Sequence, residues 1–469
     1  MGPGWLVCIA YVDPGNYQSD ILAGRQAGYT QLWLVLASSL LSLYVQVLAV
    51  RVAVYGNVSL SEAVALAFPE RWCRIPLWML TELGVILADL PEVIGFALAL
   101  KVLGGCPLHF GVLCSLVTTM VFLFSQQVGT RPLEMVCVFF MGVMSVALLF
   151  IWSVVGTDWS LFWSGVTTPK VGDGAWLAAL GTIGSVIMPH NLFLHSAAVL
   201  SKPLARDAAA LRQAELLATV DPVIPILVSV VVNWAIVATA ASTLGGQEVP
   251  EFWLGIAGFC QSFPDFPQGM PSGCTLWAFA LLAAGQSSAI TTTYAGQAIM
   301  EGFLHLRVPL WMRAVTTRCV AIVPAFAVAL MFDQEGLNSL VNAVNAGISF
   351  LLSSSLIPLV RIMSSQMMGN KALGPISKRL LQLATLAVVT VNIWGTYTAA
   401  PLAWRSTVSK VLVCYGLICA FLFVRPISAA PLDFQKVRSI RGTAIEVHGV
   451  GSVAFVVTPP TSVYRLPDM

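Results

Sequence analysis

The sequence predicts an all-α protein that crosses a membrane many times. Of its 469 residues, 57% are hydrophobic and 10% are charged, whereas a soluble domain carries about 25% charged residues. Apolar runs of about 20 residues, the length that a bilayer span requires, recur along the whole chain. Two of these runs are interrupted by proline beside polar residues. The composition and the runs therefore indicate a polytopic helical membrane protein, and the interruptions indicate where its functional site lies.

Twelve hydrophobic segments are expected to form the transmembrane helices, separated by short polar loops that contain Gly, Pro or charge. They cover about residues 3–27, 31–55, 74–103, 108–126, 133–155, 174–200, 216–243, 275–303, 309–331, 338–363, 377–398 and 406–425. The sequence predicts one membrane-spanning domain over residues 1–426, with two repeats at about 3–155 and 174–363 and extra helices at 377–425. Residues 427–469 are expected to form a cytoplasmic tail.

The distribution of Lys and Arg predicts the orientation. Basic residues follow the even-numbered segments, whereas the loop GGQEVPEFW after segment 7 is acidic. Cytoplasmic loops carry an excess of Lys and Arg, so both termini are expected in the cytoplasm. The basic residues assigned to these loops are Arg71, Arg74, Arg131, Lys202, Arg206, Arg212, Arg307, Arg313, Lys371, Lys378 and Arg379.

The first interrupted segment reads IAYVDPGNYQSD and the other reads GSVIMPHNLFLHS. Proline removes a backbone donor and clashes with the preceding turn, so the helices should unwind at Pro14-Gly15 and at Pro189. Unwound backbone at membrane depth is tolerated only where it lines a buried or watery cavity. The breaks lie five segments apart and would enter from opposite sides. This pattern predicts an inverted five-plus-five repeat, with the substrate site where the repeats meet.

Each break carries side chains that can bind a metal ion. Asp13 and Asn16 offer hard oxygen ligands, and Met188 offers a soft thioether, which discriminates against Mg²⁺ and Ca²⁺. Carbonyls freed by the breaks, at Ala10 and Ser185, could complete the set. Such ligands suit Mn²⁺ or Fe²⁺, with Co²⁺, Cd²⁺ and Zn²⁺ also possible. His190 and His195 are five residues apart and nearly 140° around a helix, so we expect separate roles rather than one chelating pair.

These motifs resemble those of the Nramp family of proton-coupled divalent metal transporters. The resemblance rests on DPGN in segment 1, MPHN in segment 6 and AAGQSSAITTTYAGQAIMEGF in segment 8, and it extends over about residues 2–425. It implies a LeuT-like fold and metal ligands from the positions of Asp13, Asn16, Met188, Ala10 and Ser185. Members of that family commonly carry Asn-x-x-Gln in the segment that corresponds to 338–363, whereas this chain has Asn345 and then Ile348.

Ionisable residues inside the predicted spans suggest a path for protons, because such residues are costly in lipid and usually functional. Glu82, Asp89 and Glu92 lie in segment 3, and Arg318 lies in segment 9. The family resemblance implies a route from Asp13 through these acids and Arg318, to which His190 and His195 could contribute. A purely structural lattice of ion pairs is the alternative, above all for Glu82.

The predicted function is import of divalent transition-metal ions with H⁺ by alternating access. Transport of an organic solute and a non-transporting metal sensor remain the alternatives. The net charge of +2 and the absence of basic clusters argue against nucleic acid. No enzyme motif, resident cofactor or obligate protein partner is predicted; the partners are the metal ion, H⁺ and the bilayer. A Cys260–Cys274 disulfide is left open, in a loop predicted to lie outside.

Overall fold

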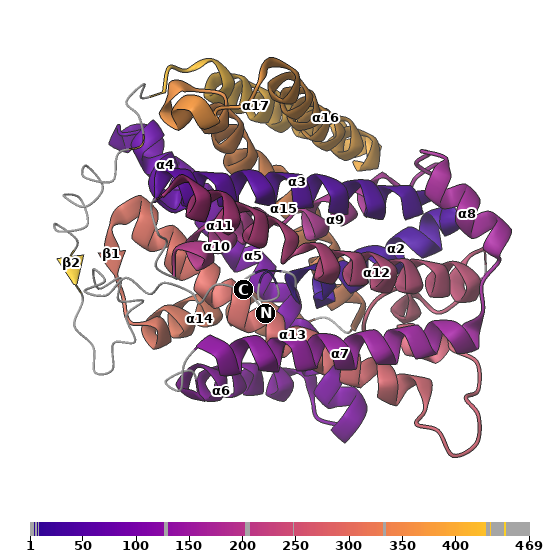
Figure 1. The fold of residues 1–469 in the computed structure, drawn as a ribbon. Helices are drawn as coiled ribbons and strands as arrows, with labels where there is room; N and C mark the ends of the chain where they lie inside the picture. Colours follow the sequence, from indigo (N-terminus) through magenta and orange to yellow (C-terminus); the bar gives the residue numbers. More distant parts are fainter. Residues whose placement is uncertain are drawn as a thin grey trace.

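Long apolar helices make up the structure (Figure 1), a computed structural model that describes residues 4, 7, 9–125, 130–201, 207–246, 248–331, 334–427, 432 and 445–446. After a 3₁₀ turn at Ile9–Val12, the helices are α2 Pro14–Ala27, α3 Leu32–Gly56, α4 Leu60–Ala67, α5 Arg71–Gly104, α6 Leu108–Ser125, α7 Thr130–Val155, α8 Trp159–Thr167, α9 Trp176–Val186, α10 Pro189–Leu200, α11 Ala208–Val220, α12 Val223–Leu244, α13 Gly273–Leu304, α14 Leu310–Met331, α15 Gln334–Met363, α16 Pro375–Ala399 and α17 Arg405–Val424.

The predicted hydrophobic segments all fall on these helices. In the described residues, ten helical stretches are long and apolar enough to cross a membrane; the first, Pro14–Gly56, holds two predicted segments, and α6 contributes a shorter apolar stretch. Three short helices were not expected: α4, α8 and α11. Ser59, Asp158 and Asp207 cap them, each accepting a hydrogen bond from backbone N–H groups of the first turn. Such capping residues at helix starts are common.

The two broken helices lie in the middle of the bundle. Figure 1 shows α16 and α17 along one side and α6 and α7 along the opposite side, with α2, α5, α9, α10 and α13 between them. The α2 helix packs against α12 and α9, and α5 runs along α13. Close packing of α2 on α5 depends on Gly95, since a Cβ there would lie 2.5 Å from Pro14 Cγ. The core therefore holds both breaks away from the lipid.

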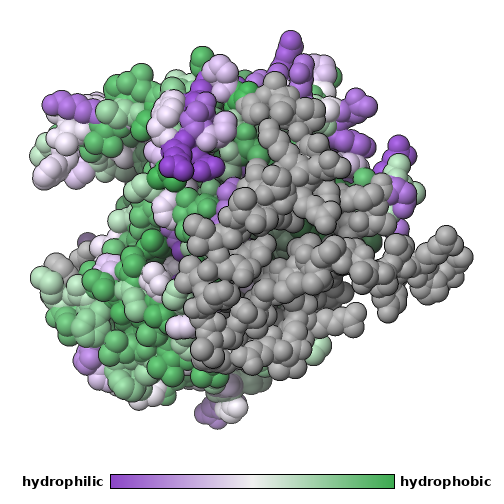
Figure 2. All heavy atoms as spheres, turned by 90° about the vertical axis from the view of Figure 1, so that its left-hand side faces the viewer, coloured by the Kyte–Doolittle hydropathy of each residue, from purple (hydrophilic) through white to green (hydrophobic). Residues whose placement is uncertain are grey.

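Apolar side chains cover the outside of the bundle. Leu380, Leu383 and Leu386 on α16, and Val411, Val413 and Leu417 on α17, are all more than half exposed. Figure 2 looks at the end of the molecule that carries β1, where hydrophilic residues gather toward the top and hydrophobic residues lie on the lower flank. An exposed apolar flank is the surface that a helical membrane protein presents to lipid, so the chain is an integral multi-pass membrane protein.

Two features of the loops bear on the predictions. Cys260 and Cys274 form a disulfide, which joins the loop after α12 to the start of α13 and resolves the question left open by the sequence. Arg313, assigned to a cytoplasmic loop, instead lies buried in α14. That assignment was wrong because a buried carboxylate of α5, described below, pairs with it inside the bundle. Lys202 and Arg206 lie outside the described residues.

Little of the predicted tail is described. Ile427 follows α17, and Leu432 N–H donates to Met367 O at 3.1 Å. Strand β2 (Ile445–Glu446) pairs in parallel with β1 (Leu306–Arg307), which follows α13. The remaining residues of 427–469 lie outside the described part, so the tail stays a prediction.

Candidate metal site and buried polar network

The first break is centred on Asp13. Its backbone is extended, with φ −94° and ψ 167°, between the turn Ile9–Val12 and helix α2. Asp13 Oδ1 accepts a hydrogen bond from Asn16 N at 2.7 Å and so caps the new helix. Pro14 occupies the first helical position, where its missing N–H costs nothing and its fixed φ suits the helix. The sequence DPGN thus both ends one helix and begins another.

The second break is built in the same way. Helix α9 ends at Val186, Ile187 and Met188 leave the helical conformation, and α10 begins at Pro189. Proline alone does not produce such a break, because Pro76, Pro91, Pro324 and Pro358 lie inside continuous helices. At both breaks the chain therefore presents the C-terminal end of one half-helix, with its free carbonyls, and the N-terminal end of the next.

Four of the predicted ligand residues meet at one point. Asn16 Nδ2 donates to Asp13 Oδ1 at 2.7 Å, to Ala10 O at 3.1 Å and to Ser185 O at 3.2 Å. Asn16 Oδ1 is buried and has no hydrogen-bond partner among the described residues. Three oxygens from the two breaks therefore surround the amino group of Asn16. The oxygen of the same amide, Oδ1, is a fourth oxygen at this point and accepts no hydrogen bond from the described residues.

Met188 lies at the start of the second half-helix and is 3% exposed. Its sulfur lies 3.9 Å from Asn191 Nδ2, one turn further along α10. The Ser185 hydroxyl, by contrast, donates back to Thr182 O at 3.5 Å within α9, so the ligand atom offered at that position is the carbonyl. The structure thus brings the predicted oxygens together and places the thioether against Asn191.

Helix α15 supports the first break through an asparagine. Asn345 Nδ2 donates to Gly15 O at 2.7 Å and to Ser19 Oγ at 2.9 Å. A Cβ at Gly15 would lie 3.0 Å from Asn345 Oδ1, so glycine allows this approach. Ile348, three residues further along α15, is buried in the apolar core. The sequence did not assign this supporting role, although an Asn inside an apolar helix was the available signal.

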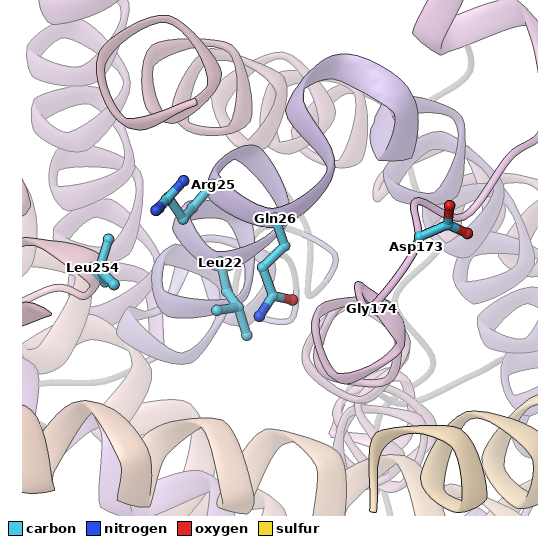
Figure 3. A pocket seen from close by; sticks show the side chains of 6 residues that line it. All are labelled: Leu22, Arg25, Gln26, Asp173, Gly174 and Leu254. Atoms are coloured by element: carbon cyan, nitrogen blue, oxygen red, sulfur yellow. The ribbon is translucent and has the colours of Figure 1, made fainter. Parts of the chain in front are cut away.

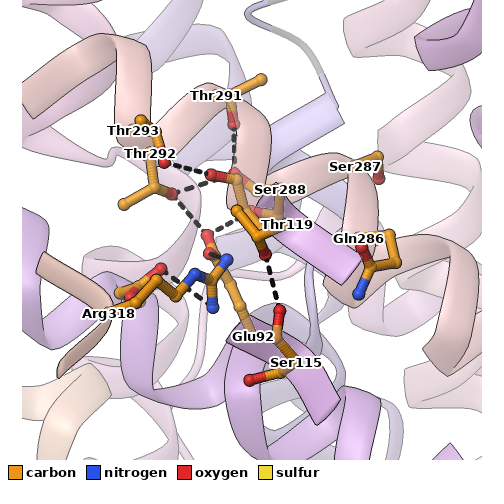
Figure 4. A network of polar contacts seen from close by, with 12 residues as sticks. Glu92, Ser115, Thr119, Gln286, Ser287, Ser288, Thr291, Thr292, Thr293 and Arg318 are labelled. Carbon is orange, nitrogen blue, oxygen red and sulfur yellow. Dashed lines mark hydrogen bonds and ion pairs between the residues drawn. The ribbon is translucent and has the colours of Figure 1, made fainter. Parts of the chain in front are cut away.

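A second polar group lies between α5, α13 and α14 (Figure 4). Arg318 pairs with Asp89 Oδ1 at 3.2 Å through Nη1 and with Glu92 Oε2 at 3.3 Å through Nη2. Ser288 Oγ donates to Glu92 Oε1 at 2.6 Å, and Thr292 Oγ1 donates to the same oxygen. All these side chains are buried. Three of the predicted proton-pathway residues are therefore in direct contact.

Glu82 pairs with a different arginine. Its Oε1 accepts from Arg313 Nη2, one and a half turns before Arg318 on α14. Arg313 also lies against Gly296 of α13, where a Cβ would be 2.4 Å from its Nη2. Two parallel acid–arginine contacts consequently join α5 to α14. The sequence missed the Glu82 pair because it placed Arg313 outside the membrane.

His190 and His195 lie on α10 and are both fully buried. His190 Nδ1 and both ring nitrogens of His195 have no hydrogen-bond partner among the described residues. Buried polar groups usually find partners, so these imidazoles are available to interact with a proton or another mobile group. Their separate roles stay a prediction.

A cavity of about 380 Å³ opens at the far end of α2 (Figure 3). Leu22, Arg25, Gln26, Asp173, Gly174 and Leu254 line it. Leu254 belongs to the loop that carries Cys260, so this end of α2 lies on the side of the disulfide. Within the described residues, no group of three His, Cys, Asp or Glu side chains could hold a metal ion.

Comparison with known proteins identifies related chains over nearly the whole length. A family model described as "Natural resistance-associated macrophage protein-like" (Nramp) matches residues 4–398. The chain is 34% identical over 437 residues to metal transporter Nramp2 of Oryza sativa subsp. japonica, which covers 90% of this chain and 83% of that protein. It is 37% identical over 398 residues to metal transporter Nramp3.2 of Populus trichocarpa, covering 83% of this chain and 78% of that protein.

Solved structures show the same fold. The manganese transporter of Eremococcus coleocola, in complex with an aromatic bis-isothiourea substituted compound, matches with a TM-score of 0.80 and 28% identity, covering 90% of this chain and 92% of that chain. Mhp1, a nucleobase-cation-symport-1 family transporter, matches with a TM-score of 0.53 and 12% identity over 94% of this chain and 96% of that one. The expected LeuT-like fold is confirmed.

Proposed function

The chain belongs to the Nramp family and is therefore a transporter rather than an enzyme, and from that premise we propose that it carries divalent transition-metal ions together with H⁺ by alternating access. The observation that carries this proposal is the convergence of Asp13 Oδ1, Ala10 O and Ser185 O on one buried amino group. Oxygens that converge on the partially positive hydrogens of a neutral amide can also converge on a cation. The names of the relatives, metal and manganese transporters, support a metal ion as that cation.

The proposed ligand set is Asp13, Asn16, Met188 and the carbonyls of Ala10 and Ser185. Rotation of the Asn16 amide would turn its uncommitted Oδ1 toward the three oxygens. Both carbonyls lie at C-terminal ends of half-helices, where the helix dipole is negative and favours a cation. Pro14, Gly15 and Pro189 create the breaks that expose these groups. Rotation of this one amide would therefore bring four oxygens together: those of Asp13 and Asn16 and the carbonyls of Ala10 and Ser185.

The proposed selectivity comes from Met188. Its sulfur lies against an amide nitrogen of Asn191, a weak contact that a thioether–metal bond can replace. Soft sulfur favours Mn²⁺, Fe²⁺, Co²⁺, Cd²⁺ or Zn²⁺ over Mg²⁺ and Ca²⁺, which take oxygen ligands. The named manganese transporter among the related structures supports Mn²⁺ as one cargo. The metal is cargo, and the proposal includes no resident cofactor.

The proposed proton path uses the buried acids and histidines. Glu92 shares its two oxygens between hydroxyl groups of α13 and Arg318 of α14, and Asp89 holds the other side of that guanidinium. A proton bound by Asp13 or Glu92 would leave Arg318 paired with Asp89. The network can therefore lose one negative charge while the arginine keeps an ionised partner. His190, His195 and the Glu82–Arg313 pair complete the proposed route.

The proposed orientation places both termini in the cytoplasm. Disulfides persist in oxidising compartments, and the Cys260–Cys274 disulfide lies in the loop after α12, on the side that the positive-inside rule assigns to the exterior. Metal ions would then enter from that side and leave on the side that carries Lys371 and Lys378. This orientation makes the protein an importer into the cytoplasm.

Uptake into proteoliposomes of Mn²⁺, Fe²⁺, Ca²⁺ and Mg²⁺, each supplied alone, tests the proposal. We expect saturable uptake of Mn²⁺ and Fe²⁺ and little of the other two. Asp13→Asn should abolish it, whereas Asp158→Asn should leave it unchanged because Asn caps helix α8 about as well as Asp. Equal uptake of all four ions, or full uptake by the Asp13 variant, would contradict the proposed site.

A further inference from the structure

One buried carboxylate has no part in the ligand set or the proposed proton path. Asp20 lies on α2, seven residues after Asp13, and is 1% exposed. Seven residues advance a helix by about 10 Å and return nearly to the same face. Asp20 therefore stands two turns above Asp13, on the same side of α2, toward the end of the helix that lies on the disulfide side.

Asp20 differs from the other buried acids of the bundle. Asp89, Glu92 and Glu82 each pair with an arginine. Asp20 Oδ2 has no hydrogen-bond partner among the described residues, and no described Lys, Arg or His forms an ion pair with it. A buried charge without a partner is strongly disfavoured. Either a proton or a cation must therefore neutralise Asp20, and a carboxylate without a fixed partner is suited to binding a cation that comes and goes.

Tyr17 connects the two carboxylates. It lies between them on α2, three residues before Asp20, and its hydroxyl is buried without a partner among the described residues. Its ring packs on Trp277 of α13 with centroids 5.4 Å apart. Oxygen atoms of Asp13, Asn16, Tyr17 and Asp20 thus follow one face of α2.

The cavity at the end of α2 does not reach this face. Helical spacing places Leu22 and Gln26, which line the cavity, on the side of α2 opposite Asp20. Trp277, on which the Tyr17 ring packs, donates from Nε1–H to Ile256 O at 3.1 Å, and its ring lies 5.2 Å from that of Phe259 between centroids.

We propose that Asp20 and the Tyr17 hydroxyl form a second binding position for the divalent cation, between the Asp13 site and the disulfide side of the membrane. This proposal rests on the proposed function. Because its donors are oxygens only, this position takes Ca²⁺ and Mg²⁺ as readily as Mn²⁺, and discrimination is left to the inner site with Met188. The ion would pass from the outer carboxylate to the inner one along α2.

Crystals of the Asp13→Asn protein soaked in Mn²⁺ test the position directly by anomalous scattering. With the inner site disabled, we expect an anomalous peak beside Asp20, and no peak there in the Asp13→Asn/Asp20→Asn double variant. The same pair can be compared by Mn²⁺ electron paramagnetic resonance in detergent. Absence of Mn²⁺ beside Asp20 in the single variant would overturn the proposal, whether or not the parent protein transports metal.

Transport provides a second, independent readout. We expect Asp20→Asn to raise the KM for external Mn²⁺ about tenfold with little change in the Kd of the inner site, Tyr17→Phe to raise it less, and Asp20→Glu to restore it. Asp158→Asn is the matched control. A parental KM together with lost dependence on external pH would assign a proton to Asp20 and overturn the metal position. If the parent protein takes up no divalent ion, the proposed function fails instead.

Discussion

Asn16 shows how one side chain can organise a site. Its amino group contacts oxygens from both broken helices, and its own carbonyl oxygen is left without a described partner. The sequence predicted Asp13, Asn16 and the two carbonyls as neighbours because polar residues beside proline in apolar runs need a shared polar environment. It could not predict that Met188 sulfur would lie against Asn191, since side-chain rotamers depend on packing.

Replacing Met188 with Leu isolates the effect of the sulfur. The change nearly conserves volume, so its stability cost should stay below about 1.5 kcal/mol. We expect the affinity for Mn²⁺ to fall about tenfold, or about 1.4 kcal/mol, and excess Ca²⁺ to inhibit Mn²⁺ uptake. Met141→Leu removes a buried thioether from α7 and should change neither quantity. If the Met188 variant still excludes Ca²⁺ as the parent does, sulfur does not determine the selectivity.

Replacing Glu92 with Gln separates metal binding from proton coupling. Gln keeps an oxygen for Ser288 and Thr292 but removes one of the two charges that face Arg318. We expect calorimetry to give a Mn²⁺ affinity within about threefold of the parent, under 1 kcal/mol, while accumulation driven by a pH gradient is lost. Glu215→Gln, which alters a partly exposed pair with Arg51, should retain coupling. Gradient-driven accumulation by the Glu92 variant would remove Glu92 from the proton path.

The helix breaks depend on neighbouring helices as much as on proline. Pro91 lies within the continuous helix α5, whereas Pro14 starts a new one. At Pro14 the new helix is capped by Asp13 and held by Asn345 of α15, 330 residues away in sequence. The cap could be predicted locally. The contact from α15 could not, because it depends on which helices become neighbours in the folded bundle.

Gly95 is predicted to control how α2 packs on α5. An alanine Cβ there would lie 2.5 Å from Pro14 Cγ, so one helix must shift. Overpacking of this kind costs about 1–3 kcal/mol, and we expect Gly95→Ala to lower both the thermal unfolding midpoint and the rate of Mn²⁺ uptake. Gly142→Ala on α7, where a Cβ meets nothing within 4 Å, serves as the control. Equal behaviour of the two variants would show that this contact adjusts freely.

Across the whole bundle, the sequence predicted the class, the helices and both breaks, because hydropathy and proline are local signals. It missed pairings between distant helices. Glu82 and Arg313 are 231 residues apart in sequence, and Arg313 was placed in a loop because it lies near the end of its helix. Asp20 was overlooked although it shares a helical face with Asp13. Its significance appears only once burial and the absence of a described partner are known.

The candidate metal site and the acid–arginine network lie on different helices, and α5 links them. The oxygens of the candidate metal site belong to the breaks in α2 and α9, while the acid–arginine network joins α5, α13 and α14. The α5 helix contacts both, through Gly95 beside Pro14 and through Glu92 one turn earlier. Transfer of a proton from Asp13 toward Glu92 would therefore follow α5, and metal movement would follow α2.

The central claim is that metal and proton cross together, and simultaneous measurement of both fluxes tests it most directly. Proteoliposomes containing the protein would carry a metal-sensitive dye and a pH-sensitive dye inside. We expect Mn²⁺ entry to acidify the lumen, and an inward proton gradient to drive Mn²⁺ above its external concentration. Asp13→Asn should abolish both signals. Mn²⁺ entry at the same rate with and without the gradient, and without acidification, would contradict the account.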